Sequence, residues 1–138
     1  MSLTKFVAVA AASVVVTLGA GLGSAAQADS SGYLALQKSD GSYYRAGSVS
    51  FDSDSTTSPE REVFSVTDNA ADGYGIRMEW KTAAKSNSCT NSHGSGRAIL
   101  CSYDLLENRD IQYRICAVDY VNGAYRTIKC GGWWSDRT

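Results

Sequence analysis

The only histidine of the chain, His93, lies in the segment NSHGSG and is the side chain best suited to proton transfer near neutral pH. A small secreted hydrolase or ribonuclease-like toxin would pair it with Glu79, Ser92 or Arg97. Such catalysis requires groups that converge in space, which spacing along the chain does not establish. The chain has no G-x-S-x-G segment. We therefore expect a solvated loop histidine, and the His93-dependent enzyme is the alternative function.

Two further groups resemble metal ligands. Residues 52–56 have acidic side chains two positions apart, as calcium loops do, but they are not followed by the glycine and glutamate that those loops require. The cysteines contain no C-x-x-C pair, which argues against a zinc site. We expect residues 52–56 to be a surface loop, and we expect neither a metal nor a cofactor.

Aromatic residues near the end of the sequence suit a binding surface. Two tyrosines flank the turn pair Asn122-Gly123, which would place them at an exposed tip. Two adjacent tryptophans cannot both face the core from one strand, because successive strand side chains point to opposite faces. Rigid aromatic rings on exposed loops are typical of binding surfaces, although rings also cover the open ends of sandwiches. The candidate binding residues are Tyr120, Tyr125, Trp133, Trp134 and His93.

The first 28 residues have the pattern of a secretory signal peptide. Lys5 supplies a positive start, residues 6–23 are apolar or small, and Ala26-Gln27-Ala28 is a cleavage motif before Asp29. A retained membrane anchor is the alternative, because the apolar run is long. We expect a secreted, extracellular protein in which residues 29–138 form a single domain that has no membrane contact after signal removal.

The even number of cysteines in an exported chain predicts two disulfides. Four cysteines allow three pairings. We predict Cys89–Cys101 and Cys116–Cys130, because each of these bridges closes a local hairpin or loop. Loops of this length should contribute about 3 kcal/mol each to the free energy of unfolding.

Residues 111–130 are the clearest structural element of the chain. The apolar side chains at 111, 113, 115 and 117 alternate with their neighbours, which predicts a strand with one face on a core. Asn122-Gly123 predicts a tight reversal into a returning strand at 124–130. A two-residue turn would pair Tyr120 with Tyr125, whereas a three-residue turn with a bulge would place Cys116 opposite Cys130. We predict the bulged turn, because a disulfide would fix that register.

Five further strands are expected, at 33–37, 42–51, 61–67, 74–81 and 97–103, with a long polar loop over 83–96. No segment outside the signal has helical periodicity over ten residues. About seven short strands predict an all-β antiparallel sandwich, immunoglobulin-like or fibronectin-III-like and stabilised by disulfides. The segment YRICAVDYVNG resembles the penultimate strand of fibronectin-III domains, but this short likeness assigns no family. The predicted core aromatics are Phe51, Phe64, Trp80 and Tyr113.

Composition narrows the functional classes. Without Lys5 the chain has 12 basic and 14 acidic residues, which does not match the basic footprint of a nucleic-acid binder. A small disulfide-stabilised scaffold with many aromatics and no catalytic constellation predicts a non-enzymatic binding domain. We expect it to be an inhibitor or antagonistic factor that acts on an extracellular protein or a cell-wall glycan. The Cys89–Cys101 loop, which contains residues 91–94, is the candidate inhibitory loop. A passive matrix component is a further alternative.

Overall fold

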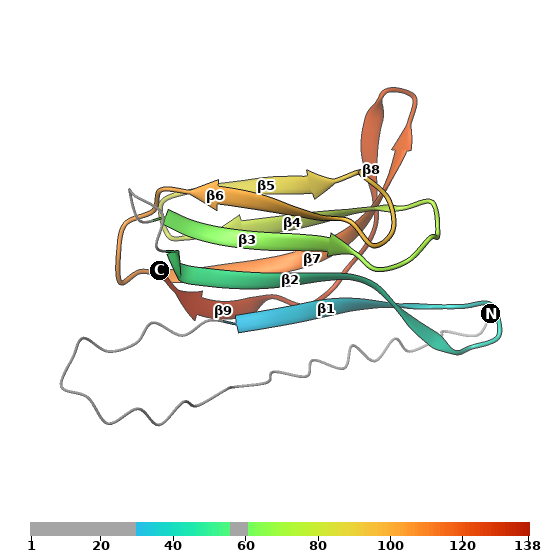
Figure 1. Cartoon of the computed structure of the whole chain (residues 1–138), viewed down its shortest axis with the longest axis horizontal. Helices are drawn as coiled ribbons and strands as arrows, with labels where there is room; N and C mark the ends of the chain where they lie inside the picture. The colour runs from blue at the N-terminus through green and yellow to red at the C-terminus, as the bar shows by residue number, and fades with distance from the viewer. Residues whose placement is uncertain (1–29, 56–60) are drawn as a thin grey trace.

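The computed structural model describes residues 30–55 and 61–138, and the predicted signal peptide at residues 1–28 lies outside them. The described chain forms nine β-strands and no helix, arranged as two antiparallel sheets that pack as a sandwich (Figure 1). This arrangement confirms the all-β prediction. The strands are β1 (Ser30–Gln37), β2 (Tyr43–Ser55), β3 (Arg61–Asp68), β4 (Gly75–Lys81), β5 (Ser86–Asn91), β6 (Ala98–Tyr103), β7 (Asp110–Val121), β8 (Ala124–Cys130) and β9 (Trp134–Arg137).

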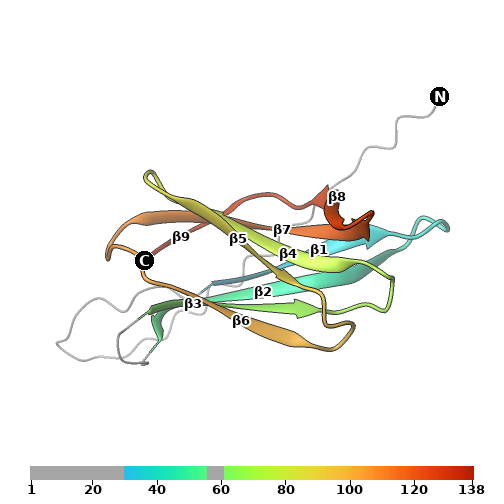
Figure 2. The same ribbon diagram turned by 90° about the horizontal axis from the view of Figure 1, so that it is seen from above.

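The order of the strands defines two sheets. Sheet A has the order β1-β2-β3-β6, and sheet B has the order β5-β4-β7-β8, with β9 also paired to β7. The chain crosses between the sheets after β3, after β5 and after β6, and Figure 2 shows the sandwich from above. The β3–β4 and β5–β6 loops therefore meet the β7–β8 hairpin at one end of the sandwich (Figure 1). The β4–β5 and β6–β7 connections lie at the opposite end. The immunoglobulin-like or fibronectin-III-like type stays a prediction.

The core lies between the two sheets and contains all four predicted aromatics, each at most 3% exposed. The ring centroids of Phe51 and Phe64 are 4.7 Å apart, and those of Phe64 and Tyr113 are 5.5 Å apart. Each such ring buries on the order of 150–250 Å² of surface, so this cluster supplies much of the driving force for folding. In β4, Ile76, Met78 and Trp80 face the core, which confirms the predicted alternation.

β3 has an unusual inward face, because carboxylates stand at both ends of its buried apolar residues. Glu62 and Asp68 are 1% and 2% exposed. The Glu62 carboxylate accepts a hydrogen bond from the Leu105 N–H (2.9 Å), and the Asp68 carboxylate accepts one from the Ala70 N–H (3.1 Å). Burial raises the pKa of both carboxyl groups above its ordinary value. One strand thus fixes a loop at each end of the sandwich.

Both predicted disulfides are present, Cys89–Cys101 and Cys116–Cys130. The Cys116–Cys130 bridge joins neighbouring strands of sheet B, with a Cα–Cα distance of 4.0 Å. Cys89 lies in β5 of sheet B and Cys101 in β6 of sheet A, with a Cα–Cα distance of 6.4 Å. The Cys89–Cys101 bridge closes the loop between two consecutive strands, as predicted, and it also links the two sheets, which the sequence did not indicate.

The predicted bulged turn at the tip of the β7–β8 hairpin is wrong. Asn122 and Gly123 both have positive φ, at 52° and 83°, and form a two-residue turn that pairs Tyr120 with Tyr125. The register then shifts between residues 117 and 118 of β7, where Ile128 is the extra residue of β8. This bulge brings Cys116 opposite Cys130. The pairing required for the disulfide is therefore produced by a bulge within the strands and not by the turn.

The sequence pattern missed two strands and the end of a third. β5 lies inside the predicted loop at 83–96, and β9 follows the Gly131-Gly132 pair. Neither has an apolar alternation, because Cys89 is the one apolar residue of β5 and Trp134 the one apolar residue of β9. Each strand is held by pairing with a strand of the core. Residues 52–55, expected in a surface loop, extend β2, whereas residue 56 lies outside the described chain.

Candidate binding cleft at the hairpin end

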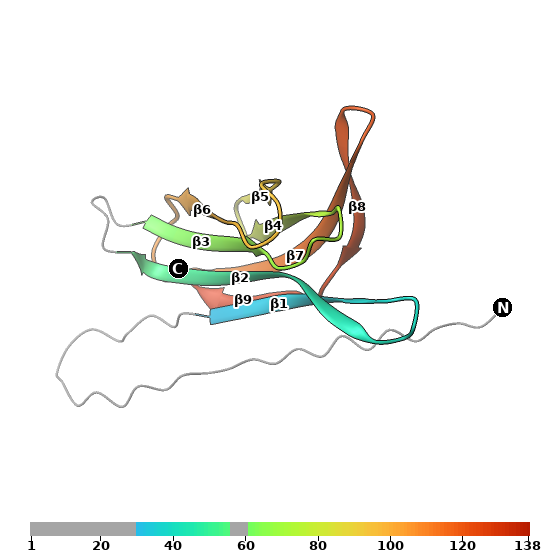
Figure 3. The ribbon, with the colours of Figure 1, turned by 45° about the vertical axis from the view of Figure 1, so that its right-hand side comes forward.

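A cleft of about 680 Å³ opens at the hairpin end of the sandwich. Figure 3 shows the β7–β8 hairpin projecting beyond the sheets. Three residues of this hairpin line the cleft and form one of its walls. The β3–β4 and β5–β6 loops supply the rest of the lining. The lining residues are Asp68, Ala70, Ala71, Gly73, Tyr74, Gly75, Ser92, Gly94, Ser95, Asp119, Tyr120 and Tyr125.

The hairpin wall presents two of the predicted binding residues. Tyr120 and Tyr125 are 64% and 42% exposed, and their ring centroids lie 5.0 Å apart in a tilted arrangement. The two residues face each other across the hairpin, so each ring supports the other. The Cys116–Cys130 bridge holds the base of the same hairpin. Both tyrosines are therefore exposed beside the turn, and the disulfide constrains the hairpin that carries them.

The β3–β4 loop is held by hydrogen bonds from several sides. The Asn69 N–H donates to the Ala46 carbonyl (2.9 Å), and the Tyr74 N–H donates to the Asp72 carboxylate (3.0 Å). The Tyr44 hydroxyl donates to the other oxygen of Asp72 (2.9 Å). Burial and the adjacent Asp72 carboxylate raise the pKa of Tyr44 to about 12, so this hydroxyl remains a donor over the physiological pH range.

Asn91 organises the β5–β6 loop from inside the protein. Its side-chain amide is fully buried and donates to the Val66 carbonyl (2.9 Å) and the Arg97 carbonyl (2.7 Å). Its side-chain oxygen accepts a hydrogen bond from the His93 N–H (3.1 Å). Within the predicted Cys89–Cys101 loop, Asn91 is therefore a buried anchor, while Ser92 and Gly94 line the cleft.

His93 lies between two lining residues without lining the cleft itself. It is exposed, and its imidazole has no hydrogen-bond or charged partner among the described residues. Glu79, one of the groups proposed to pair with it, is engaged with Arg77 (3.0 Å) and Arg114 (2.7 Å) on sheet B. The structure thus brings the His93 loop to the tyrosines, and none of the described carboxylates contacts the His93 imidazole.

The charged groups of the cleft are acidic. Asp68 and Asp119 line it, and none of its described lining residues is lysine or arginine. Asp119 lies 4.0 Å from Arg126 in an exposed pair, which contributes little to stability. The Asp68 carboxyl has a raised pKa because of its burial, with a smaller contribution from the Asp72 charge. Such a lining favours ligand groups that donate hydrogen bonds or carry positive charge.

Neither tryptophan lines the cleft, and the two neighbouring side chains have different surroundings. Trp133 is 37% exposed, and the charged groups of Lys81 and Arg114 lie 4.1 and 4.6 Å from the centre of its ring. Trp134 stacks on the core residue Tyr113 at 5.7 Å and covers Gly32, where an added Cβ would meet the indole at 2.6 Å. One tryptophan is therefore a surface residue of sheet B, while the other closes the core.

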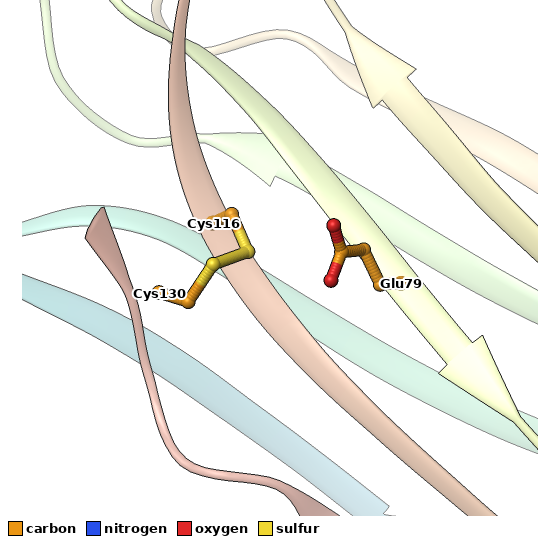
Figure 4. A group of neighbouring side chains, drawn as sticks. All are labelled: Glu79, Cys116 and Cys130. Atoms are coloured by element: carbon orange, nitrogen blue, oxygen red, sulfur yellow. A yellow bond between two sulfur atoms is a disulfide. The ribbon is translucent and has the colours of Figure 1, made fainter. Parts of the chain in front are cut away.

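A cluster of Glu79, Cys116 and Cys130 has its potential metal-binding atoms within 4.8 Å of one another. Figure 4 shows the sulfur–sulfur bond of the two cysteines with the carboxylate beside it. A disulfide supplies no thiolate ligand, and arginines already contact both oxygens of Glu79. This cluster is therefore a disulfide beside an ion pair and does not form a metal centre.

No helix in residues 30–55 and 61–138 is long and apolar enough to cross a membrane. Comparison with protein-family models, with curated proteins and with solved structures found no match to this chain.

Proposed function

We propose that this chain is a secreted, non-enzymatic binding domain that holds a segment of an extracellular protein in the hairpin-end cleft. The observation that carries this proposal is the convergence of three connections, remote in sequence, on one cleft rich in tyrosine, serine and glycine. Antibody binding loops have the same composition, because tyrosine provides rigid contact area while serine and glycine provide adaptable hydrogen bonding. Loops at one end of a sandwich also carry the binding sites of antibody variable domains.

The charge and size of the cleft suggest what it holds. Its volume of about 680 Å³ lies in the range of ligand pockets, which is roughly 300–1,000 Å³. Asp68 and Asp119 would attract a lysine or arginine side chain, and Tyr120 and Tyr125 would contact that cation through their ring faces. We therefore expect the bound segment to contain a basic residue.

Rigid walls favour an inhibitory or antagonistic role. The Asn91 and Asp72 hydrogen bonds fix the two loops before any ligand arrives, so binding orders few additional groups. A binder of this kind acts by covering a segment that its target needs for its own contacts. A cell-wall glycan is the competing ligand, since tyrosine faces and carboxylates also suit hydroxyl-rich ligands.

A displayed library of random peptides tests this proposal directly. Selection on residues 29–138 should enrich peptides that contain lysine or arginine. Tyr120→Ala and Tyr125→Ala should each weaken binding of the selected peptide by roughly thirtyfold, equivalent to about 2 kcal/mol at a contact hot spot. Tyr43→Ala is the matched control, because Tyr43 is 48% exposed but does not line the cleft.

Two outcomes would contradict the proposal. If the tyrosine variants keep wild-type affinity at an unchanged melting temperature, the binding surface lies elsewhere. If a cell-wall polysaccharide fraction binds in a tyrosine-dependent way and no peptide is enriched, the ligand is a glycan. Loss of a hydrolytic activity in His93→Ala would instead support the enzyme that the sequence left as an alternative.

A further inference from the structure

The end of the sandwich opposite the hairpin contains a groove of about 750 Å³. It lies between the β4–β5 turn and the β6–β7 loop, and it shares no residue with the tyrosine cleft. Figure 1 shows these connections at the end of the sandwich away from the projecting hairpin. The lining residues are Thr82, Ala83, Ala84, Lys85, Leu105, Leu106, Asn108, Arg109, Asp110 and Arg137.

The groove presents apolar side chains to solvent. Leu106 is 71% exposed, Leu105 is partly buried against the core, and Ala83 and Ala84 are exposed beside them. A leucine this exposed, in a concave site with other apolar groups, is more than the scattered surface leucine of ordinary proteins. Side chains of alanine and leucine offer no hydrogen bonds, so the walls suit a hydrocarbon chain better than a peptide backbone, whose polar groups need partners.

Cations surround this apolar surface. Lys85, Arg109 and Arg137 line the groove together with one acidic residue, Asp110. Arg137 is partly engaged, because it donates to the Asn108 carbonyl (2.9 Å) and lies 4.0 Å from Asp110. The side chains of Lys85 and Arg109 have no hydrogen-bond or charged partner among the described residues. Two cationic groups are therefore available to an anion at the rim of an apolar groove.

The β4–β5 wall of the groove is held in place without a ligand. The Thr82 hydroxyl accepts hydrogen bonds from the Ala84 and Lys85 N–H groups (3.3 and 3.1 Å), which fixes the turn. The Thr82 N–H in turn donates to the Lys85 carbonyl (2.7 Å). The apolar side chains of this turn are therefore presented by a closed, locally bonded backbone.

The β6–β7 wall is fixed from two sides. The buried Glu62 carboxylate holds the Leu105 N–H, as described above. The Asn108 N–H donates to the carbonyl of the buried Thr138 (2.6 Å), and the Arg109 N–H donates to the Thr138 hydroxyl (3.0 Å). A groove that exists before binding loses little conformational entropy when it is filled.

From these observations we propose that the groove binds a single-chain amphiphile with an anionic headgroup. The alkyl chain would lie against Leu105 and Leu106, and a carboxylate, sulfate or phosphate headgroup would pair with Lys85 and Arg109. The β6–β7 loop also carries Asp104 and Glu107, which do not line the groove. An extended anionic bilayer would have to approach these two negative charges, whereas one headgroup paired with Lys85 and Arg109 would not. The groove therefore suits a single molecule rather than a membrane surface. This site is independent of the tyrosine cleft and of its proposed ligand.

Nuclear magnetic resonance titration with dodecanoate, kept below its micelle concentration, tests this inference. The amide signals of residues 82–85 and 105–109 should shift in a saturable way. Dodecyltrimethylammonium, which has the same chain length and a positive headgroup, should bind at least tenfold more weakly. Dodecyl maltoside, with a neutral headgroup, should fall between the two. Binding of dodecanoate should weaken as salt is added, because the rim charges are exposed.

Variants separate the two parts of the site. Lys85→Gln combined with Arg109→Gln should weaken dodecanoate binding by about tenfold, and the neutral detergent should be unaffected. Leu106→Ser should weaken all three probes. Lys38→Gln removes one positive charge from the β1–β2 turn and should change nothing, and the melting temperature of each variant reports its folding.

Three results would overturn the proposal. Equal binding of the cationic and anionic chains would show that the rim charges do not select the headgroup. Shifts concentrated at the hairpin end or in the core would place the chain elsewhere. An acidic leucine-containing peptide that displaces dodecanoate with higher affinity would make the groove a peptide site.

Discussion

The two ends of the sandwich are built alike and differ in what they display. At each end a buried carboxylate of β3, Glu62 or Asp68, accepts a backbone N–H and fixes the loop beside it. The surfaces above these anchors are opposite in character, with tyrosines and carboxylates at the hairpin end and leucines and cations at the other. The buried carboxylates of β3 thus fix the position of the loop at each end, while the residues of each loop determine which ligand groups the surface can bind.

The ends also differ in how their outer walls are held. The hairpin end relies on a covalent bond, because Cys116–Cys130 joins β7 to β8 below the tyrosines. The groove end relies on hydrogen bonds to Thr138 and Glu62. Removing the disulfide or one of these hydrogen bonds should therefore destabilise the loops at one end of the sandwich more than those at the other.

The largest effect is expected for removal of the hairpin disulfide. The Cys116→Ala, Cys130→Ala double variant should lose about 3 kcal/mol of unfolding free energy, measured by denaturant titration, because the bridge closes a 14-residue separation. Hydrogen exchange should show that amides near Tyr120 and Tyr125 lose protection first, while the Leu105 amide keeps more of its protection.

The Cys89→Ala, Cys101→Ala variant is the comparison for this prediction. That bridge links the two sheets, so its loss should lower global stability without selective exchange at the hairpin tip. If both double variants show the same pattern of exchange, the two ends are not held independently.

A smaller effect is expected for Asn91→Ala. The change removes the buried donor to the Val66 carbonyl and the acceptor of the His93 N–H, while the Arg97 carbonyl keeps the Asp68 N–H as a donor, and this should cost about 2 kcal/mol of unfolding free energy. The amide of His93 should exchange faster, and affinity for a peptide bound in the cleft should fall with the loss of loop order. The matched variant Asn87→Ala removes an exposed asparagine of the same strand, β5, and should have little effect. If the two variants lose the same amount of stability, Asn91 does not anchor the β5–β6 loop.

The smallest effect concerns pH. Because burial raises the pKa of Glu62 above its ordinary 4.5, and that of Asp68 above 3.8, both groups stay protonated to higher pH in the folded protein than in the unfolded chain. Their contribution to stability is complete below the ordinary pKa and is lost as the pH rises through the raised value. Glu62→Gln and Asp68→Asn should therefore gain stability relative to the parent protein as the pH rises above the ordinary pKa of each carboxyl group.

Chemical denaturation at several pH values measures this difference. A relative stability of Glu62→Gln that does not change with pH would show that Glu62 titrates normally. A pH-dependent gain at Asp68 alone would show that only the hairpin end is anchored by a carboxyl of raised pKa.

Regular alternation made most of the fold predictable from sequence. Phe51, Phe64, Trp80 and Tyr113 were recognised as core residues because they lie in strands with one clearly apolar face. β5 was missed because the segment SNSCTN has no apolar face, and its strand conformation comes from pairing with β4. Glu62 and Asp68 were not recognised as anchors, since a buried carboxylate has no signature in sequence beyond its place in the alternation.

The candidate sites were less accessible to sequence reasoning. Tyr120 and Tyr125 were found because a turn pair lies between them. The β3–β4 and β5–β6 loops lie beside this hairpin because the chain crosses from one sheet to the other after β3 and after β5. No local sequence pattern indicates where such crossings occur. The leucine groove depends in addition on the hydrogen bonds of Thr138, a residue whose type indicates no role.

The edge of β7 that faces away from β4 is covered by two short strands. β8 pairs with residues 116–121 and β9 with residues 110–113, and between them the Gly131 N–H donates to the Ile115 carbonyl (2.9 Å). β7 is among the longest and most apolar strands of the chain, and it would be a strong template for aggregation if this edge were open. One continuous segment therefore covers nearly the whole edge of β7, so the backbone groups of this long apolar strand cannot pair with a strand of another chain while the protein is folded.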